Sequence, residues 1–197
     1  MQYFDSLPKL YTITPRGTSV LTNIMARASI IQSVLNNPLL YYTYDIQDSD
    51  TPEIVAHKYY GSSYYYWVLM YTNQLTDPLW DWPLSRRNFD AYIEQKYTQF
   101  DPYTTTHHYE KIITQVDAGT NTTTENIVNI SLIDYIVLQE TTTTYSLPTG
   151  QVTVSVTKKA VSYYEYELNL NESKRTIKIL NKSYLGQFED ELKRLML

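Results

Sequence analysis

The 197-residue sequence contains no cysteine, only five glycines and only three histidines. The absence of cysteine excludes a disulfide framework, a thiol nucleophile and any cysteine-ligated zinc or iron–sulfur site. Five glycines are too few for a nucleotide-binding fold with glycine-rich loops, and the HExxH, GxSxG, P-loop and GxGxxG patterns are all missing. These absences leave little catalytic chemistry, so we expect a protein that has no cofactor and is not an enzyme.

The sequence also lacks a basic leader followed by an apolar run, and it lacks an uninterrupted apolar stretch of membrane-spanning length. The longest apolar-looking stretch, residues 19–35, is broken by Asn23, Arg27 and Gln32. Hydrophobic residues nevertheless make up 43% of the chain, which is enough to bury a core and argues against wholesale disorder. The sequence therefore predicts a soluble, folded protein that is made and kept in a cytoplasm.

Charge of one sign is in excess. The chain has 21 acidic and 16 basic residues, and the net charge of −5 argues against a general nucleic-acid binder. Residues 44–84 carry six acids and a single base, Lys58, while the rest of the chain is balanced. Nine of the 21 tyrosines lie between residues 41 and 71. Tyrosine offers a large contact area and a hydroxyl that tolerates water, so this region is predicted to be a concentrated docking surface.

The histidines and acids form no convincing catalytic group. His57 lies in a predicted helix, where a packed or surface role is favoured over general-base catalysis. His107 and His108 are adjacent on a predicted strand, where their side chains would point to opposite faces and could not chelate one metal well. The acids of residues 44–84 could include a glycosidase pair, but a solvated acidic face is the simpler interpretation. We therefore assign no catalytic, cofactor-binding or metal-ligating residue.

The N-terminal region, residues 1–38, is predicted to be an extended arm followed by a helix. Two prolines and a glycine break any helix up to residue 17. Apolar residues at helical spacing then predict a helix from Thr18 or Ser19 to about Asn36. Its apolar stripe is broad, which fits either a core helix or a helix packed against a partner protein.

The region between residues 39 and 100 is predicted to hold one strand and three helices. An aromatic, β-prone run opens it. The first helix would be capped by Asp50 or Thr51 and ended by Gly61 in a left-handed conformation, and Ser85 would cap the third. The predicted elements are the strand 39–46 and the helices 52–60, 63–73 and 86–97.

Residues 101–182 are rich in threonine, valine and isoleucine and are predicted to form an antiparallel β region. The apolar alternation changes phase at Asp134, which predicts a bulge or a strand break. The polar stretches 117–125 and 140–150 are predicted to be connecting loops, although the threonines at 141–144 could themselves be strand. The predicted strands include 152–157 and a hairpin of 161–170 with 174–180.

The C-terminal residues 183–197 are predicted to form an amphipathic helix. Its apolar stripe consists of Tyr184, Phe188, Leu192 and Leu195, and the chain then ends in three apolar residues. A terminal helix with such an end often docks onto another surface.

The segment 44–84 resembles a LysM domain, a small βααβ module. Trp80-Asp81-Trp82-Pro83-Leu84 stands where a LysM domain usually has its closing strand. The resemblance implies an α+β fold, with a small LysM-like βααβ module flanked by helices and followed by an antiparallel β-rich region and a C-terminal helix. It rests on Tyr44-Asp45-Ile46, Asp50-Thr51-Pro52-Glu53-Ile54-Val55-Ala56, Lys58-Tyr59-Tyr60-Gly61, Tyr66-Trp67, Asn73 and Asp77-Pro78.

The longer run of residues 50–85, DTPEIVAHKYYGSSYYYWVLMYTNQLTDPLWDWPLS, is similar to the baseplate wedge protein 53 family of T-even-type contractile-tailed bacteriophages, and so is the stretch 161–180. The resemblance implies a non-enzymatic subunit of the tail baseplate wedge that clamps neighbouring wedges around the central hub. Its partners would be other wedge subunits, the sheath-initiator subunit and neighbouring wedges in a six-fold, multi-copy assembly, with no nucleic acid and no membrane. Its place would be the virion, after assembly in the cytoplasm of the bacterial host.

Two other functions fit parts of the sequence. A peptidoglycan- or chitin-binding LysM module would stack tyrosine and tryptophan rings on sugar faces, and a glycoside hydrolase would need two positioned carboxylates. By analogy with the resembled family, protein docking is the prediction that we carry forward. The candidate docking residues are Tyr59, Tyr60, Tyr64, Tyr66, Trp67, Trp80, Trp82, Tyr184, Phe188, Leu192 and Leu195.

Overall fold

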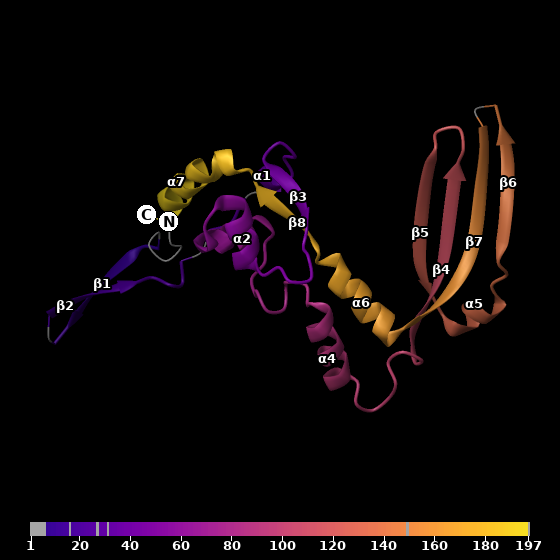
Figure 1. The fold of residues 1–197 in the computed structure, drawn as a ribbon, viewed down its shortest axis with the longest axis horizontal. Helices are drawn as coiled ribbons and strands as arrows, with labels where there is room; N and C mark the ends of the chain where they lie inside the picture. The colour runs from indigo at the N-terminus through magenta and orange to yellow at the C-terminus, as the bar shows by residue number, and fades with distance from the viewer. Residues whose placement is uncertain (1–6, 16, 27, 31, 149, 197) are drawn as a thin grey trace. The chain divides into compact units, whose positions relative to one another are not determined.

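A computed structural model describes residues 7–15, 17–26, 28–30, 32–148 and 150–196. The chain folds into two compact units (Figure 1). Unit 1 consists of residues 1–86 and 171–197, and unit 2 consists of residues 87–170. Unit 2 is therefore an insertion into the chain of unit 1. The fold is mixed, with helices and antiparallel sheets, as the predicted α+β class requires.

Unit 1 is built on a two-stranded antiparallel sheet of β3 (Tyr41–Asp45) and β8 (Thr176–Leu180). Three helical elements follow β3, namely α2 (Pro52–Tyr60), η2 (Ser63–Tyr65) and α3 (Tyr66–Thr72). The Thr51 side chain accepts a hydrogen bond from the Ile54 amide at the start of α2, and Gly61 ends it at a φ of 84°. The predicted strand and the first two predicted helices are confirmed.

The core of unit 1 lies between this sheet and the helices. Val55, Val68 and Leu69 from α2 and α3 are fully enclosed and pack with Ile177 and Ile179 of β8. The apolar residues of β8 alternate with polar ones, so one face of the strand is buried and the other is exposed. This pattern fixes β8 against α2 and α3 although more than a hundred residues separate them in the sequence.

The C-terminal helix also belongs to this core. After η3 (Lys182–Tyr184), α7 (Leu185–Met196) buries Leu185, Leu192 and Met196, and its Phe188 ring stacks on Trp67 at 5.8 Å between centroids. The predicted amphipathic helix is confirmed, and it packs against its own chain.

The N-terminal region differs from the prediction. β1 (Lys9–Thr14) and β2 (Gly17–Thr22) form an antiparallel hairpin, and among the described residues of this region only α1 (Gln32–Leu35) is α-helical. The predicted helix from residues 18–19 to 36 is therefore wrong. Gly17 has a φ of 122° that suits a tight turn, and β1 offers β2 a complete ladder of backbone partners. Residues 1–6, 16, 27 and 31 of the predicted arm and helix lie outside the described residues.

Unit 2 contains a four-stranded antiparallel sheet in the order β5-β4-β7-β6 (Figure 1). The predicted antiparallel β region is thus confirmed, and so is the strand at 152–157. Thr122–Glu125 and Thr141–Leu147, predicted to be loop for the most part, are strand, because threonine is β-branched and these strands are solvated. The strands are β4 (Thr106–Asp117), β5 (Thr122–Ile130), β6 (Thr141–Leu147) and β7 (Gly150–Ser162).

The predicted phase change near Asp134 marks a real strand break. A short helix, α5 (Leu132–Val137), follows β5, and the Ser131 hydroxyl accepts a hydrogen bond from the Asp134 amide at 3.1 Å. The residues after the break are therefore helical, and they do not form a second strand.

Two further helices complete this part of the chain. α4 (Arg86–Lys96) is the predicted third helix and buries Phe89 and Ile93, and α6 (Tyr163–Ser173) follows β7. The predicted hairpin of 161–170 with 174–180 is wrong, since 163–173 is helical and β8 pairs with β3. The Ser162 hydroxyl accepts a hydrogen bond from the Glu165 amide at 3.2 Å, which is the start of a capping box.

A nearly buried carboxylate joins these two helices within unit 2. The Glu167 side chain, 8% exposed, accepts hydrogen bonds from Lys96 Nζ and the Tyr97 hydroxyl, both at 2.7 Å. Burial alone would raise the pKa of Glu167, but these two donors outweigh it and hold the pKa below its usual value. The Phe89 and Tyr164 rings add an edge contact at 5.7 Å between centroids.

Candidate protein-docking site

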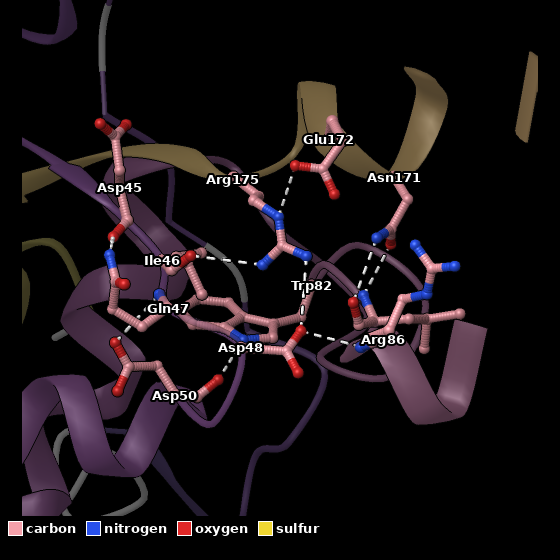
Figure 2. A network of polar contacts seen from close by, with 11 residues as sticks. Asp45, Ile46, Gln47, Asp48, Asp50, Trp82, Arg86, Asn171, Glu172 and Arg175 are labelled. Carbon is pink, nitrogen blue, oxygen red and sulfur yellow. Dashed lines mark hydrogen bonds and ion pairs between the residues drawn. The ribbon is translucent and has the colours of Figure 1, made fainter. Parts of the chain in front are cut away.

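Asp50, in the segment that resembles a LysM domain, is bonded to several parts of unit 1, and Figure 2 shows it beside Gln47 and Trp82. Its carboxylate has no exposed surface and accepts hydrogen bonds from Lys58 Nζ at 2.5 Å, the Tyr44 hydroxyl at 2.5 Å and the Gln47 amide at 3.2 Å. Its carbonyl accepts a bond from Trp82 Nε1 at 2.9 Å. Burial opposes the charged form, but the bonds from Lys58 and Tyr44 prevail and lower the pKa of Asp50. One carboxylate thus ties β3 to α2 and orients the loop that carries Trp82.

A second group of contacts fixes the C-terminal segment beside this loop. Arg175 donates from Nε to Glu172 at 2.6 Å, bonds the Ile46 carbonyl at 3.3 Å and lies 3.6 Å from the Asp48 carboxylate. The Asn171 side chain donates to the Leu84 carbonyl and accepts from the Leu84 amide, at 3.1 and 2.7 Å. Figure 2 shows that these bonds hold residues 171–175 against the chain around residues 46–48 and 82–86. Each of these side chains bonds another part of the fold, so the network stabilises unit 1.

The acidic excess of residues 44–84 is offset within the fold. Unit 1 contains eleven acidic and eleven basic residues and is formally neutral, while unit 2 contains ten acidic and five basic residues and carries the whole net charge of −5. Bases of the C-terminal segment, such as Arg175 beside Asp48, account for the difference. Unit 1 therefore has no net charge, and we look for its docking surface among its exposed apolar side chains.

An apolar groove runs along α7. It has a volume of about 350 Å³ and lies between the segment around Ile30 and Val34, Tyr71 of α3, and Phe188 and Leu195 of α7. A second depression of about 360 Å³ shares Val34 and Phe188 with it and continues toward Tyr184. Together the groove and the second depression are lined by four of the predicted docking residues, namely Tyr184, Phe188, Leu192 and Leu195.

Comparison with known proteins identifies the family. The sequence model of the base plate wedge protein 53 family matches residues 21–195. The chain belongs to this family. The curated protein "Baseplate wedge protein gp53" of Enterobacteria phage T4 is 29% identical over 157 residues, which cover 78% of this chain and 72% of the T4 protein. The family resemblance predicted from the sequence is confirmed.

In this wedge protein 53 family member, four of the predicted docking residues lie in the core of unit 1. Tyr60, Trp67, Trp82 and Leu192 are all at least 94% buried. Tyr60 donates its hydroxyl hydrogen to the Leu180 carbonyl at 3.0 Å, and Trp82 bonds the Asp50 carbonyl. In this fold they pack beneath the surface of unit 1, and Leu192 also lines the base of the groove.

The other predicted residues reach the surface. Tyr64 is 60% exposed, Trp80 is 63% exposed and Leu195 is 57% exposed. Tyr184 is more than one-third exposed, and the rings of Tyr59, Tyr66 and Phe188 are half-buried. Seven of the eleven candidate residues thus reach the surface, and docking through them stays a prediction: Tyr59, Tyr64, Tyr66, Trp80, Tyr184, Phe188 and Leu195.

The hairpin β1–β2 is a further candidate docking surface. The sequence predicted a helix in part of this region and did not predict the hairpin. Its apolar side chains are largely exposed, with Ile13 at 89%. The apolar residues themselves are visible in the sequence. Only the structure shows that they are exposed, and an exposed apolar patch is typical of a contact surface. The exposed apolar residues of this region include Leu10, Tyr11, Ile13, Val20, Leu21, Ile24 and Met25.

The histidine pair of unit 2 corrects another expectation. The register of β4 shifts between Thr106 and His108, and this irregularity brings the two imidazoles together, with Nδ1 atoms 2.8 Å apart. His108 Nε2 lies 3.0 Å from Glu110, and the His107 ring stacks on Tyr166 at 4.0 Å. The prediction that the two side chains point to opposite faces is therefore wrong. Within the described ranges, no group of three or more potential metal ligands is formed.

Helices long and apolar enough to cross a membrane do not occur in the described part of the chain.

Proposed function

We propose that this protein is a non-enzymatic structural subunit of a contractile phage tail baseplate wedge, and that it clamps neighbouring wedges around the central hub. Membership of the family and the similarity to the T4 baseplate wedge protein support this role. The proposed partners are other wedge subunits, the sheath-initiator subunit and neighbouring wedges, in a six-fold multi-copy assembly. The proposed location is the tail baseplate of the virion, after assembly in the cytoplasm of the bacterial host.

The observation that carries the proposal is the amount of apolar surface that unit 1 leaves exposed. The groove along α7 and the hairpin β1–β2 both present large apolar side chains to solvent. Soluble monomers seldom expose contiguous apolar patches, and such patches commonly mark protein contacts. Aromatic side chains in a well-packed groove are typical anchors for a partner segment.

We further propose that the LysM-like part acts as a protein-docking module. The order β3–α2–α3 is followed in space by β8, which pairs with β3 and supplies a closing strand that the sequence lacks after Leu84. A βααβ arrangement is thus assembled from two distant segments. Peptidoglycan binding is less well supported, because Tyr60, Trp67 and Trp82 are buried and cannot stack on a sugar.

Co-expression with the other wedge subunits of the same phage, followed by size-exclusion chromatography, tests the proposal. Removing α7 would be uninformative, because Leu185, Leu192 and Met196 are part of the core. Leu195→Gln instead changes the groove with little effect on the fold. Lys193→Gln is the matched control, since Lys193 is an exposed residue of the same helix that does not line the groove.

We expect the unaltered chain and the Lys193 variant to co-elute with a wedge subunit, and the Leu195 variant to co-elute at least about tenfold less. The clamp proposal fails if the unaltered chain co-elutes with none of the wedge subunits. Saturable binding of the isolated chain to purified peptidoglycan would favour the glycan-binding alternative instead.

A further inference from the structure

The sheet of unit 2 has two chemically different faces. Residues directly opposite each other in neighbouring strands share a face, and the register places Ile113, Val128, Val154 and Tyr145 on one side. The other side carries more threonine and serine, the acids Glu110 and Glu125, and fewer apolar residues, which include Ile112, Val116 and Ile127. We call the first side the valine face; it consists of Tyr109, Lys111, Ile113, Gln115, Asp117, Thr122, Thr124, Asn126, Val128, Ile130, Thr141, Thr143, Tyr145, Leu147, Gly150, Val152, Val154, Val156, Lys158 and Ala160.

One end of the valine face is covered by α5. The Tyr135 ring lies 4.6 Å from the Tyr109 ring, and Lys158 Nζ donates to the Tyr135 and Leu138 carbonyls, both at 2.9 Å. Beyond α5, the strands of the described part of unit 2 continue as a single layer (Figure 1). At the far end Tyr145 is 53% exposed. A sheet with an apolar face normally buries that face against a second layer, which here extends over only part of it.

We propose that a second copy of this chain supplies the missing layer, with the two valine faces packed against each other. This contact is additional to the proposed wedge role and does not depend on it. The face carries Lys111, Lys158 and Asp117, so it is not where the negative charge of unit 2 is concentrated. Two copies can therefore approach through it without strong repulsion.

The positions of the charges select one arrangement. Lys111 and Asp117 lie on the same face of β4, six residues or about 20 Å apart. A two-fold axis between the sheets and perpendicular to the strands places Lys111 of each copy opposite Asp117 of the other. An axis parallel to the strands would exchange β4 with β7 and place Lys111 opposite Lys158, which is unfavourable.

The same arrangement also uses the ends of the face. The outer side of α5 exposes apolar residues, including Ile133 and Ile136, at the end of the face where Lys111 lies. Tyr145 and Leu147 are exposed at the opposite end. Because the strands of the two copies run in opposite directions, α5 of one copy flanks Tyr145 and Leu147 of the other. Both exposed patches thereby gain an apolar neighbour.

The size of the face predicts a weak contact. The four strands lie side by side only over the length of β6, which is seven residues or about 23 Å. At a spacing of about 4.8 Å, this gives a flat area of roughly 440 Å² per copy. A stable interface usually buries about 800 Å² per partner. The isolated chains should therefore associate only at high concentration.

The cysteine-free sequence allows a clean cross-linking test on the full-length chain. Thr143→Cys places a single thiol on the valine face, and Thr142→Cys places one on the opposite face of the same strand. Both positions are exposed threonines, so neither substitution should disturb the fold, and circular dichroism checks this. With a short bis-maleimide at high protein concentration, we expect the Thr143 variant to form dimers at least about tenfold faster than the Thr142 variant.

A charge exchange tests the axis. Lys111→Glu in the Thr143→Cys chain should slow dimer formation about tenfold, and adding Asp117→Lys should restore it, because the pairs are re-formed with opposite sign. Sedimentation velocity of the same charge variants without the added cysteine should show the same order of dimer fraction. Equal cross-linking from both faces would overturn the proposal, as would a dimer rate that does not rise with concentration. Loss without restoration in the double variant would overturn the proposed axis.

Discussion

Replacing Asp50 with alanine should reveal how far the LysM-like segment 44–84 depends on one buried carboxylate. The substitution removes the acceptor for Tyr44, Gln47 and Lys58. Lys58 is 53% exposed, so it regains water and contributes little. The Tyr44 hydroxyl and the Gln47 amide are left without this acceptor, at a cost of about 1–2 kcal/mol each. We therefore expect unit 1 to lose about 2–4 kcal/mol of unfolding free energy.

Tryptophan fluorescence during urea unfolding is the natural assay. All three tryptophans lie in residues 67–82, so their emission reports on unit 1 alone. Asp50→Asn keeps one acceptor oxygen and should lose less than Asp50→Ala. Asp190→Ala is the control, because its carboxylate is 81% exposed, and it should change the unfolding free energy by less than about 0.5 kcal/mol.

The same experiment has a pH dependence whose sign follows from the lowered pKa of Asp50. A lowered carboxylate pKa adds stability above the unfolded-state value of about 3.9, and that stability is lost as the pH falls through the folded-state value. The difference between the unaltered chain and Asp50→Ala should therefore shrink in acid. A loss below about 0.5 kcal/mol at neutral pH, or a difference that does not change in acid, would refute the reasoning.

Four further substitutions test single positions. Glu167→Gln should lower the stability of unit 2 by about 1–3 kcal/mol, seen by circular dichroism, and leave the tryptophan midpoint unchanged; a shifted tryptophan midpoint contradicts this. Asn171→Ala should lower the tryptophan midpoint, with a loss of about 1–3 kcal/mol from the two Leu84 bonds, and an unchanged midpoint would show that these bonds are dispensable. Gly61→Ala should cost only about 1 kcal/mol, because its φ of 84° is strained for alanine but its surroundings are open. Gly150→Ala should cost more in the sheet transition, since a Cβ would lie 2.8 Å from the backbone of Gly119, and equal losses at the two glycines would contradict the clash.

The elements that the sequence predicted well are those with local signals. α2 has a threonine cap at Thr51 and a glycine end at Gly61, and both act as expected in the structure. The C-terminal helix was predicted from its apolar spacing, and Leu192 of that stripe is indeed buried. Such signals act over a few residues and do not depend on the rest of the fold.

The failures have tertiary causes. The apolar residues between 18 and 25 fit helical spacing, but β1 supplies a strand partner that no local pattern shows. The tyrosine-rich stretch after Val161 alternates like a strand, yet the Ser162–Glu165 cap begins a helix there. That cap was visible in the sequence and outweighs the alternation, because β8 pairs with β3 and leaves residues 163–170 without a strand partner.

The docking site was only partly predictable for the same reason. Sequence identified the aromatic residues of the LysM-like segment, but not which of them face inward. That distinction depends on β8 and α7, which close the core from more than a hundred residues away and cover Tyr60 and Trp67. The groove residues Val34 and Tyr71 became apparent only once α7 was placed beside them.

The insertion of unit 2 into unit 1 sets an order for folding during synthesis. Asp45 of β3 and its partner Thr176 of β8 are separated by 131 residues, which a ribosome adding roughly 5–20 residues per second takes about 7–26 s to make. Unit 2 is contiguous and is complete before β8 emerges. The nascent chain must therefore hold α2 and α3 without their closing strand for many seconds, and this is the period in which a chaperone would be most useful to it.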